Sequence, residues 1–252
     1  MPYRSRQRLS HAPGSFWAPA DHVTSDTVIL FGAEARHAFR VCRLRKGELI
    51  TVCDGDGNAY DCEITAATAR EVEARIIRAH RRLGEPVSQV TLAVGVGKPA
   101  SFDWIVEKAV ELGVARIIPI RAEQSPSGMG GDQAAKRRVE RWRRLALGAM
   151  KQSLRSVWPP VEEMATPQEI AARIEDFHRT WLADPEGKRL ADALAEPART
   201  LNALLIIGPE GGFSEPERRL LLDRGAAPIA LGERRLRAET AAVAALTLVM
   251  QH

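Results

Sequence analysis

The chain has 252 residues, of which 45% are hydrophobic and 27% charged, a composition typical of globular proteins. Its longest apolar run, residues 241–250, is shorter than the ~20 residues of a membrane-spanning helix, and the basic N-terminus has no apolar signal segment. Its three cysteines form no C-x-x-C pair, so we expect neither a disulfide scaffold nor a zinc site. These features predict a cytoplasmic protein without membrane association or metal.

The net charge is +4, and the basic residues gather in two stretches, residues 36–46 and 136–155. The second stretch holds eight Lys or Arg against one acidic residue, Glu140. Guanidinium groups form paired hydrogen bonds with phosphates, so this distribution predicts a phosphate-rich partner. A merely solvated helix face is the alternative for any single arginine.

Residues 1 to about 80 have the pattern of short strands with one short helix at 34–43. Residues 54–58, Asp-Gly-Asp-Gly-Asn, have the composition of a tight hairpin turn. The pattern predicts a small β-barrel with strands at 27–31, 48–53, 59–64 and 71–77.

After a charged linker at 81–86, strand and helix patterns alternate, which indicates an α/β fold with a mainly parallel sheet. We therefore expect two domains, residues 1–82 and 83–252. The predicted strands are 87–94, 115–120, 180–183, 201–207 and 227–231, and the predicted helices are 102–112, 134–153, 215–224 and 239–250.

One loop of the second domain is unusually rich in glycine. It reads Gly208-Pro-Glu-Gly-Gly-Phe-Ser-Glu-Pro-Glu217 and follows the predicted buried strand 201–207. Glycines allow a ligand to approach the backbone closely, and Ser214 and Glu217 have the spacing of a helix capping box. A P-loop and a G-x-G-x-x-G dinucleotide loop are both absent from the sequence.

A second segment also leaves a strand and enters a helix. Leu231-Gly232 is followed by Leu236-Arg-Ala-Glu-Thr-Ala241, so Glu239 and Thr240 fall in the first helical turn. Helix capping is the structural alternative to any ligand role for these two residues.

The two segments together resemble the RsmE family, uridine N3-methyltransferases of small-subunit ribosomal RNA in the SPOUT (trefoil-knot) superfamily. Further agreement lies in residues 37–43 and 54–57, in Lys98 with 102–113, and in Trp142 with 152–155. The chain departs from the pattern at Ala100-Ser101, where a basic residue is common, and at Val110, Lys151 and Leu154.

The resemblance implies a knotted C-terminal domain, an N-terminal PUA-like domain that binds RNA, and a homodimer that uses S-adenosylmethionine to methylate 16S rRNA. The implied cofactor residues are Leu182, Ile207, Gly208, Pro209, Glu210, Gly211, Gly212, Leu231, Gly232, Leu236, Thr240 and Ala241. A side chain at Gly212 is expected to block the cofactor.

For catalysis, a guanidinium near the ring oxygens of uracil stabilises the negative charge that develops when N3 loses its proton. Arg237 is the first candidate, followed by Arg121 and Arg155, and Glu239 is a candidate base. The candidate RNA-binding residues are Arg36, Arg40, Arg43, Lys98, Arg137, Arg141 and Arg144.

Two alternatives stay open: an RNA-binding or ribosome-assembly protein with a vestigial catalytic site, and a knotted methyltransferase that acts on tRNA. The helix 239–250 has almost no polar face, so it must be buried all round. A second subunit is the expected cover, and complete burial within one chain is the alternative.

Overall fold

A computed structural model describes residues 14–126, 131–194 and 201–251. The chain forms two compact units, one of Met1–Glu85 with Met150–Trp158 and the other of Pro86–Ala149 with Pro159–His252. A short later segment thus belongs with the N-terminal part, and the predicted boundary at residues 82/83 stays a prediction. Within the described residues, no helix is long and apolar enough to cross a membrane.

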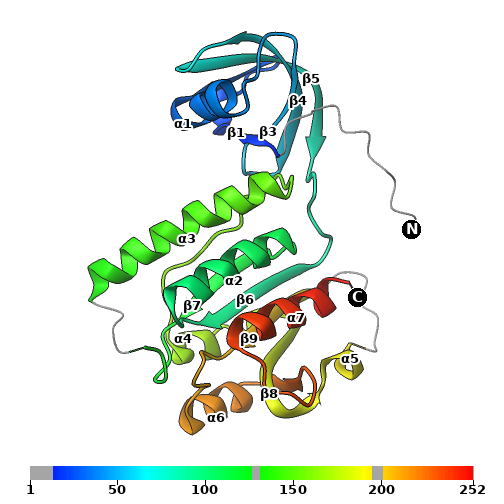
Figure 1. The fold of residues 1–252 in the computed structure, drawn as a ribbon. Coiled ribbons are helices and arrows are strands. Elements are labelled where there is room, and N and C mark those ends of the chain that lie inside the picture. The colour runs from blue at the N-terminus through cyan, green and yellow to red at the C-terminus, as the bar shows by residue number, and fades with distance from the viewer. Residues whose placement is uncertain (1–13, 127–130, 195–200, 252) are drawn as a thin grey trace. The chain divides into compact units, whose positions relative to one another are not determined.

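The first unit is built on a five-stranded sheet in the order β1-β3-β4-β5-β2 (Figure 1). The tight turn between β3 and β4 is confirmed, because the Asp54 carboxylate accepts the backbone N–H groups of Asp56 and Asn58. Gly55 and Gly57 supply the positive φ angles of +87° and +104° that this turn needs. The elements are β1 (Phe16–Trp17), η1 (Ala20–His22), β2 (Thr27–Phe31), α1 (Gly32–Arg36), η2 (His37–Val41), β3 (Leu49–Cys53), β4 (Asn58–Ala67) and β5 (Glu71–Arg81).

The predicted helix 34–43 is only partly right. α1 ends at Arg36 and continues as the π-helical turn η2, and Arg43 then adopts a left-handed backbone with φ of 56°. Leu44 is buried in the core of this unit, and its N–H binds the carbonyl of Ala38. Burial of Leu44 therefore requires the chain to leave the helical path.

The second unit contains a five-stranded sheet in the order β10-β8-β9-β6-β7, and every neighbouring pair is parallel, as predicted. The weakly predicted strand 180–183 is longer than expected, because pairing with β10 extends β8 through polar residues to Arg189. The elements are β6 (Gln89–Gly95), α2 (Pro99–Glu111), β7 (Arg116–Ile120), α3 (Asp132–Gln152), α4 (Pro167–Ala171), η3 (Ile174–Asp176), β8 (Arg179–Arg189), α5 (Leu190–Ala193), β9 (Asn202–Ile207), α6 (Glu215–Asp223), β10 (Ala227–Ala230) and α7 (Ala238–Met250).

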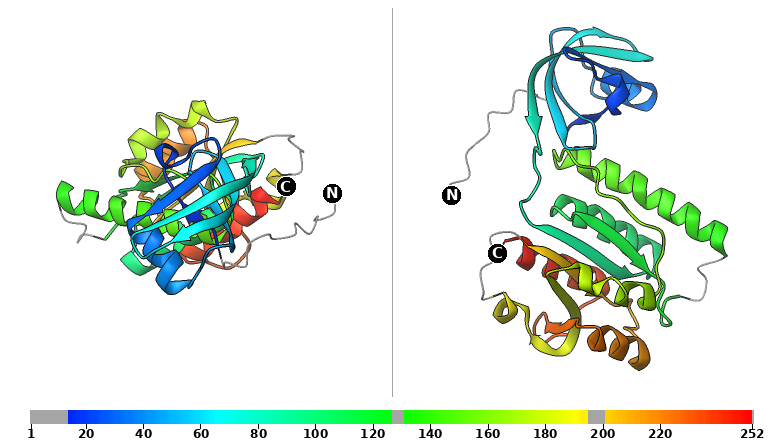
Figure 2. Two further views of the ribbon diagram at one scale, coloured as in Figure 1. Left: turned by 90° about the horizontal axis from the view of Figure 1, so that it is seen from above. Right: turned by 180° about the vertical axis from the view of Figure 1, so that it is seen from behind.

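Helices cover both faces of this parallel sheet. Figures 1 and 2 show α2 and α7 on one face and α4 and α6 on the other, and α2 packs directly on α7. On the α4–α6 face, Ile170 and Leu221 join Ile206 and other strand residues in one buried cluster. Both faces of the central strands are thus buried, which explains why residues 203–207 of β9 are a continuous apolar run.

Candidate active site

The glycine-rich loop leaves the carboxyl end of β9 and lies against the end of β6. A Cβ atom on Gly95 would come within 2.3 Å of the backbone nitrogen of Pro209, so a side chain at Gly95 is excluded. Gly212 closes the turn by donating its N–H to the carbonyl of Pro209, with φ of +79°. A Cβ on Gly212 would meet no protein atom within 4 Å, so the space itself admits a side chain. The positive φ nevertheless strains any larger residue, so a substitution there strains the backbone as well as blocking a ligand.

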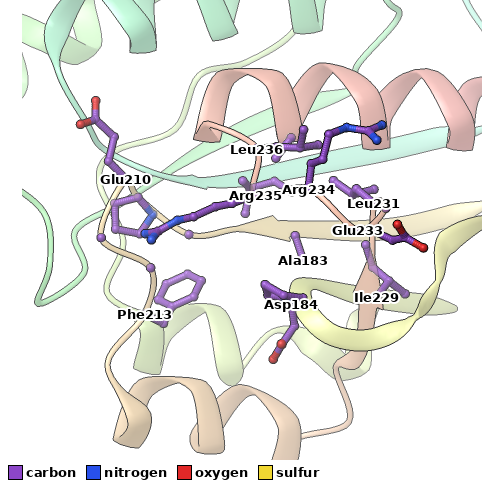
Figure 3. A pocket seen from close by; sticks show the side chains of 18 residues that line it. Ala183, Asp184, Glu210, Phe213, Ile229, Leu231, Glu233, Arg234, Arg235 and Leu236 are labelled. Carbon is purple, nitrogen blue, oxygen red and sulfur yellow. The ribbon is translucent and has the colours of Figure 1, made fainter.

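Beside this loop is a cavity of about 570 Å³. Figure 3 shows its walls, with Leu231 and Leu236 on one side and Phe213 and Asp184 on the other. Arg235 extends across the cavity toward the glycine-rich loop. The volume and the mixture of apolar side chains with exposed backbone are typical of a small-molecule site.

Ten of the twelve predicted cofactor residues line this cavity: Ile207, Gly208, Pro209, Glu210, Gly211, Gly212, Leu231, Gly232, Leu236 and Ala241. The other two do not. Leu182 is 1% exposed and packs in the core, because side chains alternate along β8 and the neighbouring Ala183 faces the cavity instead. Thr240 lies exposed on the first turn of α7.

The sequence reasoning missed the wall that β8 contributes. Ala183, Asp184 and Pro185 line the cavity, but the predicted strand stopped at residue 183. Asp184 is held from both sides, accepting hydrogen bonds from the N–H of Glu186 and from Nε of Arg218 at 2.5 Å. The bond to Asp184 raises the pKa of the Arg218 guanidinium, which stays charged.

A second, charged cleft of about 400 Å³ adjoins the first and shares Glu210, Arg235 and Leu236 with it. It brings together the first catalytic candidate, Arg237, with Glu239. The remaining residues of this cleft are Lys98 and Ser101.

The carboxylate of Glu239 does not cap α7 as the structural alternative requires. Its Oε2 atom is buried and has no hydrogen-bond partner among the described residues, and no side chain caps the helix at the N-cap residue, Arg237. A buried acceptor without a donor is costly unless a ligand supplies one. The guanidinium of Arg237 is exposed in the same cleft.

The other two catalytic candidates lie elsewhere. Arg121 is exposed on the loop after β7 and lines neither cavity. Arg155 belongs to the first unit, where it is only 3% exposed and forms a 2.6 Å ion pair with Glu85. Glu85 also accepts the backbone N–H groups of Ser156 and Val157, so Arg155 is held inside a structural cluster.

The predicted RNA-binding residues are all exposed, but they differ in their partners. Arg36, Arg40 and Arg43 follow the turn from α1 through η2 in the first unit. On α3, Arg141 is paired with Asp103, which also accepts the indole N–H of Trp142. Arg137 and Arg144 form no ion pair within the described part of the chain, and Lys98 lies 3.5 Å from Glu210.

No cysteine lines either cavity, and the described residues hold no group of three or more His, Cys, Asp or Glu side chains arranged to bind a metal ion. Burial raises the pKa of Cys53 to about 11 and that of Cys62 to about 12, so both stay protonated at neutral pH.

Both parts of the chain match known families of RNA methyltransferase domains. The RNA methyltransferase domain family matches residues 84–250, and the RNA methyltransferase PUA domain family matches residues 31–77. The chain is 31% identical to Ribosomal RNA small subunit methyltransferase E of Bacillus subtilis, over 88% of this chain and 89% of that protein. It is 32% identical to the Aquifex aeolicus protein of the same name, over 88% of this chain and 93% of that protein.

A solved structure has the same fold over nearly the whole length. The Ribosomal RNA small subunit methyltransferase E from Neisseria gonorrhoeae, bound to S-adenosyl methionine, superposes with a TM-score of 0.84 at 28% identity. The match covers 94% of this chain and 97% of that one.

Proposed function

This chain belongs to the family of RNA methyltransferases represented by ribosomal RNA small subunit methyltransferase E, and we propose that it methylates N3 of a uridine in 16S rRNA with S-adenosylmethionine as the methyl donor. The observation that carries the proposal is the pair of adjoining clefts, one glycine-rich with a mixed apolar and polar lining, the other predominantly charged. The expected place of action is the cytoplasm, on the small ribosomal subunit or its precursor.

The larger cavity fits the cofactor by size and by chemistry. Ligand sites measure roughly 300–1,000 Å³, and this cavity of about 570 Å³ falls within that range. We assign Leu231, Leu236 and Phe213 to the apolar adenine and the glycine-rich backbone to the polar part of the ligand. When bound, S-adenosylmethionine supplies a methyl group on a positively charged sulfur.

The charged cleft fits a uracil base with its N3–H group. The unpartnered Oε2 atom of Glu239 is an acceptor for that N–H group and the destination of its proton. Bound S-adenosylmethionine would supply the methyl group to the deprotonated N3, with its sulfur as the leaving group. Arg237 stabilises the negative charge that spreads onto the ring oxygens as the proton leaves.

The assignment of Arg155 as a catalytic residue is not retained in this proposal, because its side chain is 3% exposed, lines neither cavity and is ion-paired with Glu85. Arg121 is likewise not retained as a catalytic residue, because it lines neither cavity.

The dimer is part of the proposal. α7 buries Ala242, Ala245, Leu246 and Val249 but leaves Leu248 44% exposed, so a single chain does not cover the helix completely. Trp104 on the neighbouring α2 is 42% exposed. We assign these two side chains to a self-complementary interface with a second copy, and a monomeric mass in light scattering at micromolar concentration contradicts it. The knot and the RNA-binding role of the PUA-like unit belong to the same proposal.

The test is Glu239→Gln, which keeps the shape of the side chain but removes the base. Loss of a general base lowers kcat by roughly 10²–10⁴-fold, while the affinity for S-adenosylmethionine in calorimetry should stay unchanged. Glu175→Gln is the matched control, because Glu175 is exposed and lines neither cavity, so kcat and cofactor affinity should both stay unchanged.

Mass spectrometry of nucleosides from 16S rRNA and tRNA, treated with the wild-type chain, identifies the substrate. Formation of 3-methyluridine in 16S rRNA supports the proposal. Modification of tRNA alone, or RNA binding without cofactor binding, replaces it with one of the two alternatives.

A further inference from the structure

Glu217 stands out among the carboxylates of the second unit, because it is 8% exposed yet lines neither cavity. It lies in the first turn of α6, directly after the glycine-rich loop. One oxygen, Oε2, accepts the backbone N–H of Ser214 at 2.9 Å, as a helix-capping carboxylate does.

The other oxygen makes a bond that helix capping does not explain. Oε1 accepts the backbone N–H of Glu123 at 2.8 Å, across 94 residues of sequence. Glu123 belongs to the loop after β7, which also carries Arg121. A single buried carboxylate thus joins this loop to the end of the glycine-rich loop.

The two loops also touch directly. A Cβ atom on Gly211 would lie 3.0 Å from Cβ of Gln124, so little space separates the loops at the level of the cavity. Two hydrogen bonds between Ala122 and Ser125 close the loop 122–125 into a turn. Movement of one loop therefore requires movement of the other or rupture of the Glu217 bonds.

We infer that Glu217 is a positioning residue that holds the glycine-rich cofactor loop and the loop 121–125 as one unit, so that cofactor binding orders both. The inference rests on the proposed function, because it takes the larger cavity to be the S-adenosylmethionine site. Glu217 does not touch the ligand; it acts through the backbone of Ser214 and Glu123.

The chain provides a matched control. Glu169 forms a capping box with Thr166 at the start of α4, accepting the N–H of Thr166 at 2.7 Å, but it is exposed and bonds to no distant loop among the described residues. Glu169→Gln therefore perturbs a helix cap alone. Glu217→Gln perturbs a helix cap and also the bridge between loops, because an amide replaces one acceptor oxygen by a donor NH₂ group.

The affinity of each full-length chain for S-adenosylmethionine is measured by calorimetry, and KM and kcat are measured with rRNA. Hydrogen bonds to charged groups are worth enough that Glu217→Gln should weaken cofactor binding by about tenfold or more. KM for the cofactor should rise more than kcat falls. Glu169→Gln should change both within about twofold, as surface substitutions do.

Hydrogen exchange of the Glu123 amide supplies a readout that a purely structural role does not move. In the wild-type chain, S-adenosylmethionine should slow this exchange, although residues 121–125 do not line the cavity. In Glu217→Gln the exchange should be faster and should respond less to the ligand. The effect of S-adenosylmethionine on this exchange in the wild-type chain tests the inference even if the variant does not fold.

Equal cofactor affinities for the two variants, or a Glu123 amide that does not respond to the ligand in the wild-type chain, overturns the inference. Failure of the wild-type chain to bind S-adenosylmethionine instead overturns the proposed function. In that case, comparison of Glu123 exchange between wild type and Glu217→Gln without ligand still measures the bridge.

Discussion

Two ion pairs between a carboxylate and a cation, one in each unit, differ strongly in their exposure to solvent. In the first unit, Glu85 and Arg155 are each 3% exposed, and Glu85 also binds two backbone N–H groups. In the second unit, Lys98 and Glu210 lie 3.5 Å apart with 75% and 43% of their side chains exposed.

The buried pair is complete within the protein, so neither charge is available to a ligand. The open pair is weakly held, because water screens it, and its charges stay available. Solvent exposure, and not residue type, therefore distinguishes the structural Arg155 from Lys98, a cation that is free to bind RNA.

The largest expected effect comes from breaking the buried pair. Glu85→Gln leaves the Arg155 guanidinium buried without its counter-charge, and such changes cost about 3–5 kcal/mol of unfolding free energy. Urea denaturation measures the loss. Glu63→Gln, in the exposed Glu63–Arg75 pair of the same unit, should cost less than about 1 kcal/mol.

Similar losses for both variants would contradict the distinction between buried and open pairs. The same experiment tests the role of Arg155. If its contribution is structural, the methylation activity of Glu85→Gln should follow the folded fraction as urea is added.

The second prediction concerns the contact between Gly95 and the glycine-rich loop. Gly95→Ala places a Cβ atom 2.3 Å from the nitrogen of Pro209, and overpacking of this kind costs about 1–3 kcal/mol. The loop has to move, so S-adenosylmethionine affinity in calorimetry should fall together with stability.

Gly148→Ala is the control, because a Cβ there meets nothing within 4 Å and Gly148 lies inside α3. It should raise stability by about 0.5–1 kcal/mol, since alanine favours helix more than glycine. Unchanged cofactor affinity in Gly95→Ala would show that the loop tolerates displacement.

The sequence predicted the glycine-rich wall of the site well, because its glycines and flanking strand are contiguous. It predicted β8 poorly, because residues 184–189 are polar and only pairing with β10 extends the strand. The packing of Leu182 in the core rather than in the cavity wall was missed for the same reason, since a strand of uncertain extent gives no reliable alternation between core and cavity.

Contacts between residues far apart in the chain could not be predicted from the sequence, for a different reason. Nothing near Arg155 indicates that Glu85 neutralises it, and nothing near Glu217 indicates a bond to Glu123. Hydrophobic periodicity indicates which face of a helix or strand is buried, but it does not indicate which distant residue packs against that face.

A smaller effect is expected from the open pair. Lys98→Ala should change the unfolding free energy by less than about 1 kcal/mol, because exposed ion pairs contribute little. It should weaken RNA binding in a filter-binding assay and leave S-adenosylmethionine affinity unchanged, since Lys98 lines the charged cleft but not the larger cavity. Loss of stability comparable to that of Glu85→Gln would mean that the pair is not open in solution.

The smallest and most specific effect concerns the arginines of α3. Arg144 forms no ion pair among the described residues, whereas Arg141 makes a two-point contact with Asp103. Loss of one complete phosphate contact lowers the slope of log K against log salt by about 0.7–0.9. Because Asp103 already neutralises Arg141, Arg144→Ala should show the full change and Arg141→Ala a clearly smaller one. Binding titrations at several salt concentrations measure both slopes. Equal slopes would mean that Arg141 leaves Asp103 to reach the RNA, and unaltered slopes in both variants would make this helix face merely solvated.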